Sequence, residues 1–155
     1  MKDSIAMQPI AHVRGGRTGM EDDGWGANRV RIELDAARFT AAALTGLDGF
    51  SHAGILFLFH AVRQETVFAE ERRPRGNPEW PRVGIFAQRN KDRPNRLGAT
   101  ICRIVAVEGT VLIVEGLDAI DGTPVLDIKP VMRGFLPRGD VRQPSWADAL
   151  MENYW

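Results

Sequence analysis

The sequence predicts a mainly β (all-β class) protein, a single-sheet β-barrel with one or two short helices. Short segments with apolar or alternating patterns fit strands, and Gly, Pro, Asn and Asp signals separate them at intervals of about ten residues. Many short strands at this spacing favour a closed or nearly closed barrel, because closure also removes unpaired strand edges. We expect one domain over residues 1–155, with a core at 8–132 and a C-terminal tail at 133–155.

The expected strands differ in how fully they are covered. Residues 29–34 alternate between charged and apolar side chains without a break, which indicates a half-buried strand, and an earlier strand is expected at 10–14. Residues 54–60 are apolar on both faces, so this strand should lie centrally and be covered on two sides. Further short strands are expected at 83–87, 99–107, 111–115 and 125–129, with a hairpin turn at Glu108-Gly109-Thr110 and a stop at Pro130.

Two segments suit helices. Residues 35–47 begin with an acidic residue, contain the run Ala41-Ala42-Ala43 and have Gly46 near their end. Residues 145–154 predict a short terminal helix, with Ser145 as its N-cap and Asp148 three residues later in a weak capping box. Residues 15–26 and 72–81, rich in Gly and Pro respectively, should be irregular.

Composition bounds the protein class without choosing a function. The hydrophobic fraction of 44% and the charged fraction of 26% are ordinary for a soluble globular protein. No run approaches the ~20 apolar residues of a membrane span, and no signal peptide precedes the first strand. The single cysteine, Cys102, excludes an internal disulfide and reads as a buried small hydrophobe rather than a nucleophile. We therefore expect a cytoplasmic protein without a membrane partner.

A net charge of zero conceals an uneven distribution. Residues 72–103 carry nine basic and two acidic side chains, a net charge of +7, whereas both flanking regions are net acidic. A block of this kind can face phosphates. The alternative is a solvated face whose arginines pair with nearby carboxylates. Charge alone favours this alternative, because a nucleic-acid-binding domain usually has a basic overall balance.

Common nucleotide and metal motifs are missing. No Gly-x-Gly-x-x-Gly or Gly-Lys-Ser/Thr loop is present, and the glycines at 15–19 have the spacing of a turn. His12, His52 and His60 lack the partners of a zinc site, so we expect no metal. His60 follows the most hydrophobic strand, where it suits a structural hydrogen bond and a ligand contact equally.

Two loops carry most of the chemistry. Residues 84–98 and 116–130 each lead from a short apolar strand into a loop rich in charge, Gly and Pro. Loops held between strands are where binding and catalytic groups concentrate. One loop supplies Arg, Asn and Pro, and the other supplies Asp-x-x-Asp-Gly-Thr-Pro, so together they predict a polar ligand pocket.

Several segments, in order, resemble the TsaA-like (TrmO, formerly YaeB) family. They are Phe50-Ser51-His52-Ala53-Gly54-Ile55-Leu56-Phe57-Leu58-Phe59-His60, Gly84-Ile85-Phe86-Ala87-Gln88-Arg89, Arg93-Pro94-Asn95 and Leu117-Asp118-Ala119-Ile120-Asp121-Gly122-Thr123-Pro124-Val125-Leu126-Asp127-Ile128-Lys129-Pro130. The likeness covers residues 8–132, and its last segment is specific.

The resemblance implies both a fold and an activity. It implies a single-sheet barrel that binds S-adenosylmethionine (SAM) and forms a homodimer with the cofactor near the interface. It also implies an enzyme, a methyltransferase that modifies N6 of threonylcarbamoyladenosine at position 37 of tRNA, beside the anticodon.

Site residues follow from the resemblance by position. Arg89 would hold the SAM carboxylate, Asp118 or Asp121 its ammonium or ribose hydroxyls, and Trp25 an apolar or cationic face. Asp118, Asp121 and His60 are candidates for a catalytic base, with the choice open. The implied cofactor contacts are Asp23, Gly24, Trp25, His60, Ala61, Arg89, Ala99, Asp118, Asp121, Gly122, Thr123 and Pro124, and the implied substrate contacts are Lys91, Arg93, Asn95 and Arg96.

Each assignment has a structural alternative. Residues 121–124 alone are an ordinary turn signal, residues 93–95 can serve to lock a loop, and Trp25 can be simple packing. The sequence also departs from the family, at Asn90-Lys91-Asp92, at Arg96-Leu97 and at Gly24-Trp25-Gly26, and it lacks the C-terminal domain of long members. Methylation of another RNA site or a small molecule, and a non-catalytic SAM-binding barrel, therefore stand as alternative functions.

Overall fold

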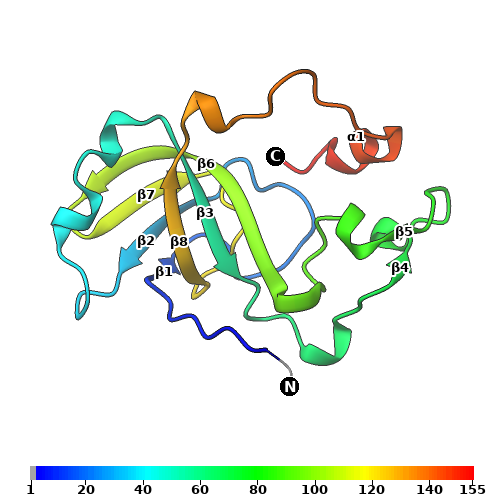
Figure 1. The fold of residues 1–155 in the computed structure, drawn as a ribbon, viewed down its shortest axis with the longest axis horizontal. Coiled ribbons are helices and arrows are strands. Elements are labelled where there is room, and N and C mark those ends of the chain that lie inside the picture. The colour runs from blue at the N-terminus through cyan, green and yellow to red at the C-terminus, as the bar shows by residue number, and fades with distance from the viewer. Residues whose placement is uncertain (1–2) are drawn as a thin grey trace.

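The computed structural model describes residues 3–155 and contains a closed, six-stranded antiparallel barrel (Figure 1). Around the barrel the strands follow the order β1-β2-β7-β6-β3-β8, and β8 closes onto β1. The predicted barrel class is thereby confirmed. The strands are β1 (Ala11–Arg14), β2 (Arg29–Leu34), β3 (His52–Leu58), β6 (Leu97–Glu108), β7 (Val111–Glu115) and β8 (Pro124–Pro130).

The barrel interior is filled by every second side chain of its strands. In β3, Ala53, Ile55 and Phe57 are buried, whereas the intervening residues are half-buried, as the period of two along a strand requires. Phe57 fits because its neighbour is Gly98: a Cβ atom built there would lie 2.4 Å from the Phe57 ring. The glycine thus leaves room for the largest fully buried side chain.

Antiparallel pairing sorts the connections to two ends of the barrel. The β1–β2, β3–β6 and β7–β8 connections all lie at one end, because Leu58 pairs with Leu97 and His12 with Pro124 there. We call this the polar end. The β2–β3 connection and the β6–β7 hairpin lie at the other, which we call the apolar end. In Figure 1 the cyan β2–β3 connection is at the left, and β4, β5 and α1 are at the right.

Smaller elements decorate the barrel. The β3–β6 connection contains a two-stranded sheet of β4 (Glu71–Arg72) and β5 (Val83–Gly84), and the helix α1 (Ser145–Met151) belongs to the tail. Short 3-10 turns occur at Ala41–Leu44, Leu47–Gly49, Gln64–Thr66, Pro74–Gly76, Ile85–Ala87, Pro94–Arg96 and Arg133–Phe135. Within residues 3–155, no helix is long and apolar enough to cross a membrane.

The predicted helix at residues 35–47 is wrong. The segment forms turns and one short 3-10 stretch instead, with Thr40 extended before it and Gly46 left-handed, at φ +86°, after it. Of the four residues in the stretch only Leu44 is buried. A helix this short gains most of its stability from packing a continuous apolar face, and this segment instead has to bend across the barrel end.

Four other local predictions also need correction. The strand expected at 83–87 ends at Gly84, because buried Ile85 begins a 3-10 turn. Ser145 is not the N-cap of α1: Pro144 precedes the helix without a side-chain cap, and Asp148 accepts a hydrogen bond from the Gln143 amide instead. The helix ends at Met151, short of the predicted Tyr154. Strand β3 ends at Leu58, because the His60 amide turns back to bond to the Leu58 carbonyl.

Candidate functional site

The predicted loops at residues 84–98 and 116–130 each contact β6, at the consecutive residues Ala99 and Thr100. The guanidinium of Arg89 donates a hydrogen bond to the backbone carbonyl of Ala99, and the hydroxyl of Thr100 donates to one carboxylate oxygen of Asp118. Arg89 comes from the β3–β6 connection and Asp118 from the β7–β8 connection. The polar end therefore holds an exposed cation and a half-buried anion close to the same strand.

A tyrosine completes the surroundings of Asp118. The hydroxyl of Tyr154, from the tail, donates to the second carboxylate oxygen of Asp118. Burial raises the pKa of the Tyr154 phenol well above its ordinary value, and the Asp118 charge and hydrogen bond raise it further. Arg89 and Arg75 oppose this rise in pKa, so both cations act on the same position. Asp118 thus receives one hydroxyl donor on each oxygen.

The loop at residues 23–25 borders this group. The Asp23 carboxylate makes a two-pronged ion pair with Arg75, with nitrogen–oxygen distances of 2.7 and 3.1 Å. The backbone amides of Gly24 and Trp25 donate to the carbonyls of Asn153 and Tyr154, at 3.0 and 2.8 Å. The structure therefore brings the predicted Asp23–Trp25 loop to the Asp118 side of the polar end, with the tail between.

Trp25 is a packed residue with one face already occupied. Its side chain is buried, its indole N–H donates to the carbonyl of Glu21, and the Arg17 guanidinium lies 4.0 Å from the ring centroid. The cation stacked on the Trp25 ring is thus Arg17 of the same chain. The packing role considered for Trp25 from sequence is therefore present, and its hydrogen bond to Glu21 holds the β1–β2 connection together.

The Asp121-to-Pro124 segment works as a turn in this structure. The Asp121 carboxylate accepts from the Gly15 amide at 2.8 Å, which joins the β7–β8 and β1–β2 connections. Gly122 has φ +82° and bonds to the carbonyl of Val13, Thr123 is buried, and Pro124 begins β8. A Cβ built on Gly122 would lie 3.9 Å from Nε2 of His60, so the exposed imidazole lies beside this turn, next to exposed Ala61.

The basic block divides into two kinds of arginine. One kind is neutralised: Arg72, Arg75, Arg82 and Arg103 form ion pairs with Asp92, Asp23, Glu71 and Glu115. The other kind donates to backbone carbonyls and forms no ion pair with a carboxylate among residues 3–155. Arg73, Arg89, Arg93 and Arg96 belong to this second kind, with the carbonyls of Trp80, Ala99, Gln88 and Val62 as acceptors.

The predicted substrate contacts lie in one loop of the polar end. Asn95 and Arg96 adopt left-handed backbone conformations, with φ values of +65° and +51°. Residues other than glycine adopt this conformation at a cost in free energy. Such backbone conformations persist where the surroundings fix them, and they cluster at functional sites. In the same loop the Asn95 side chain is exposed, and Lys91 and Arg93 are half-buried.

Cys102 is buried in the barrel. Burial, and to a lesser extent the Asp118 charge, raises the pKa of the Cys102 thiol to about 12, which suits the buried hydrophobe predicted from sequence. Among residues 3–155, no group of three or more His, Cys, Asp or Glu side chains is arranged to hold a metal ion.

Sequence reasoning missed four residues of this site. Thr100, Tyr154, Arg75 and Arg17 each contact a predicted residue, but each lies in a segment without a recognisable motif. Tyr154 is the only tyrosine of the chain, a signal that could have drawn attention to it. Its partner lies 36 residues away in sequence, beyond the reach of any local pattern.

Comparison with known proteins places the chain in a family. Residues 18–135 match the model of the tRNA-methyltransferase O N-terminal domain. The chain belongs to this family. The TsaA-like (TrmO) resemblance is thereby confirmed. Crystal structures of TrmO share the fold: one matches with a TM-score of 0.73 and 31% identity, over 91% of this chain and 64% of that chain.

Curated relatives of this TrmO-family chain carry related names. The human tRNA (adenine(37)-N6)-methyltransferase is 39% identical over 111 residues, which is 72% of this chain and 24% of the relative. The Escherichia coli protein of the same name is 40% identical over 65% of this chain and 44% of the relative. A putative SAM-dependent methyltransferase of Pseudomonas aeruginosa, RcsF, is 43% identical over 67% of this chain and 45% of the relative. The chain thus matches less than half the length of each of these relatives.

Proposed function

We propose that the protein is a SAM-dependent tRNA methyltransferase that methylates N6 of threonylcarbamoyladenosine at position 37. Family membership and the names of the relatives support this activity. The main structural support is that Arg89 and Asp118 form hydrogen bonds to consecutive residues of β6, Ala99 and Thr100. A cation and an anion so placed match the amino-acid end of SAM, where a carboxylate and an ammonium share one carbon atom.

The residues at the polar end fit this cofactor chemically. Exposed Arg89 would bind the carboxylate through a charge-assisted pair. Asp118 would bind the ammonium, because a carboxylate has about four lone-pair positions and Thr100 and Tyr154 take only two. The other predicted contacts, at residues 23–25, 60–61 and 121–124, would form the rest of the pocket. Backbone groups there would form hydrogen bonds with the polar edges of the cofactor.

The chemistry supplied by bound SAM is an electrophilic methyl group on a sulfonium. Transfer from it is an in-line displacement, so holding donor and acceptor in line supplies much of the rate. A carbamoylated N6 is a weak nucleophile until it loses its proton. Of the three candidate bases, Asp118 and Asp121 already accept hydrogen bonds from the protein, so we assign the exposed His60 imidazole as the base.

The tRNA would approach through the uncompensated arginines of the basic block. Arg93 and Arg96 bond to backbone carbonyls, and with Lys91 they present positive charge to phosphates while Asn95 lies exposed among them. Binding through such contacts should weaken steeply with salt.

Assembly and location complete the proposal. We propose a homodimer and a cytoplasmic location, with residues 1–155 acting as one domain. Support for the dimer comes from exposed apolar side chains: Ile101 of β6 is 55% exposed, and Phe86 is 81% exposed. Exposed apolar surface is a common feature of subunit contacts.

One experiment tests the activity. Purified protein is incubated with methyl-labelled SAM and total tRNA from strains that contain or lack threonylcarbamoyladenosine. We expect label only in the modified tRNA. Label in both tRNA pools would show that another RNA site is the acceptor, and label in neither, despite SAM binding, would remove tRNA methylation as the function.

A further inference from the structure

The tail runs back across the polar end instead of leaving the barrel. In Figure 1 the red end of the chain turns from α1 toward β6. The Trp146 ring of α1 packs against Trp80, with ring centroids 6.5 Å apart. After the helix, the carbonyls of Asn153 and Tyr154 accept hydrogen bonds from the Gly24 and Trp25 amides. Side-chain packing and backbone pairing together hold the segment at the site.

Gly26 adapts the β1–β2 connection to this segment. A Cβ atom built on Gly26 would lie 2.8 Å from both the backbone carbon and the backbone oxygen of Trp155. Backbone atoms cannot yield as a flexible side chain can, so only glycine permits this approach.

Tyr154 is the residue that the docked segment delivers. Its side chain is half-buried, its ring meets Trp155 edge to face at 4.8 Å, and its hydroxyl reaches Asp118. A phenol is protonated at neutral pH, and burial first, then the Asp118 charge, raises the pKa of Tyr154 further, so this hydroxyl remains a donor. Thr100 donates to the opposite carboxylate oxygen. The Asp118 carboxylate is therefore held by two hydroxyls from different parts of the chain.

We propose that Tyr154 is a positioning residue of the cofactor site, which with Thr100 fixes the Asp118 carboxylate so that its remaining lone pairs meet the ammonium of SAM. This inference rests on the proposed function and deepens it. A carboxylate that is not held must lose rotational freedom when it binds a ligand, and holding it in advance removes that cost.

The test compares two ligands on two variants. Affinities of SAM and of 5′-methylthioadenosine, which lacks the amino-acid group, are measured by calorimetry on the full chain. We expect Tyr154→Phe to bind SAM about tenfold more weakly, in keeping with the loss of a hydrogen bond to a charged group. The affinity for 5′-methylthioadenosine should change less than about twofold, because that ligand has no ammonium for Asp118 to bind. Ser145→Ala, which removes a hydroxyl from the start of α1, is the control and should change neither.

Thr100→Val sharpens the test through a double-mutant cycle. If both hydroxyls act through Asp118, the two substitutions together should cost measurably less or more than the sum of the single effects. Purely additive losses would contradict a shared action. The single tyrosine allows a second, ligand-free measurement: phenol absorbance should titrate at lower pH in Asp118→Asn than in the native protein, because the charge that raises the Tyr154 pKa is gone.

Each outcome decides for or against the inference. Equal losses for both ligands would show that Tyr154 only maintains the fold, and an unchanged or tighter SAM affinity in Tyr154→Phe would show that the tail obstructs the site. Either result overturns a positioning role. If native protein binds SAM and depends on Tyr154 but labels no tRNA, the inference stands and the proposed acceptor fails.

Discussion

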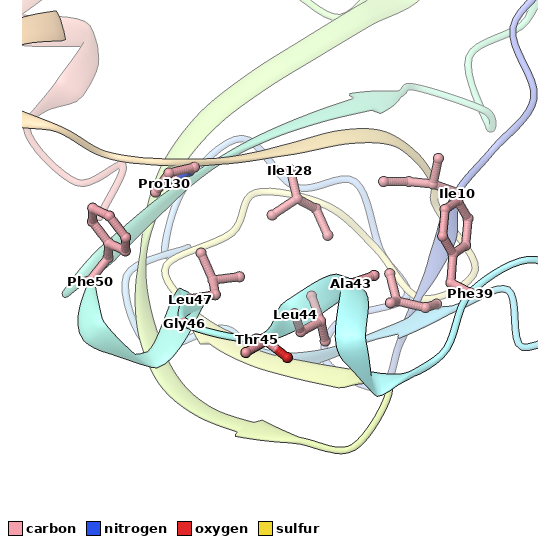
Figure 2. A pocket seen from close by; sticks show the side chains of 11 residues that line it. Ile10, Phe39, Ala43, Leu44, Thr45, Gly46, Leu47, Phe50, Ile128 and Pro130 are labelled. Atoms are coloured by element: carbon pink, nitrogen blue, oxygen red, sulfur yellow. The ribbon is translucent and has the colours of Figure 1, made fainter.

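The two ends of the barrel are closed in opposite ways. At the apolar end, the β2–β3 connection lies over a cavity of about 500 Å³ that is lined mainly by apolar side chains (Figure 2). At the polar end, three connections and the tail are tied by ion pairs and hydrogen bonds around Asp118. The residues that line the apolar cavity are Ile10, Leu34, Phe39, Ala43, Leu44, Thr45, Gly46, Leu47, Phe50, Ile128 and Pro130.

This difference separates stability from ligand binding along one barrel. Apolar contacts are non-directional and scale with the area buried, so they suit an end that only has to cover the core. Hydrogen bonds and ion pairs are directional, and they hold individual charges in place at the end where we propose that SAM binds. Substitutions at the two ends should therefore affect different properties.

The largest effect is expected at the apolar end. Leu44→Ala removes a side chain that is 4% exposed, and it should lower the free energy of unfolding by about 2–5 kcal/mol. SAM affinity at a temperature where the variant remains folded should stay unchanged. Denaturant unfolding and calorimetry measure the two quantities, and weakened SAM binding would show that the ends are coupled.

Arg89→Ala should give the reverse pattern. Loss of the cation that we propose pairs with the SAM carboxylate should weaken affinity about 10–100-fold, which corresponds to about 1.5–3 kcal/mol. The matched control is Arg38→Ala, since Arg38 also donates to a backbone carbonyl, that of Pro9, but lies near the apolar end. Equal SAM affinities for the two variants by calorimetry would exclude Arg89 from the site.

A smaller effect should separate the two kinds of arginine at the polar end. Arg93→Ala removes a charge without a local counter-ion and should reduce the salt dependence of log K for tRNA by about one. Arg82→Ala removes an arginine already paired with Glu71, at 3.1 Å, and should reduce it less. Filter binding over a series of salt concentrations measures both slopes, and equal changes would mean that local pairing does not decide which arginines meet phosphate.

The smallest effect concerns alkaline pH. Because the folded-state pKa of Tyr154 is raised, its contribution to stability is present below the unfolded pKa of about 10 and is lost as the pH rises above that value. Unfolding midpoints measured across this range should fall more steeply for the native protein than for Tyr154→Phe. Parallel curves would mean that the phenol is not buried against Asp118.

The strands were predictable where the pattern depends only on local periodicity. The bounds of β2 and β7 agree with those predicted, because strict alternation fixes which residues face a core. The helix at 35–47 failed because helix propensity of the alanine run was outweighed by the need to cover the barrel end with Leu44 and Leu47.

The site was predictable only where a motif carried it. Arg89 and Asp118 lie in recognisable loops, and their connections could be expected at one barrel end once the strands were assigned. Arg75 could not be found, because its contact with Asp23 depends on a left-handed backbone at φ +52° and spans 52 residues. Tyr154 depends equally on tertiary docking, which no local pattern encodes.

The position of β1 limits how this protein can be divided. The family match begins at residue 18, whereas β1 spans Ala11–Arg14 and is the strand that joins β2 to β8. A fragment trimmed to residues 18–135 would lack β1, so the barrel would be open and the edges of β2 and β8 would be unpaired. It would also lack Tyr154. Expression of a fragment bounded by the family match would therefore give an open sheet that is prone to aggregate through its unpaired edges.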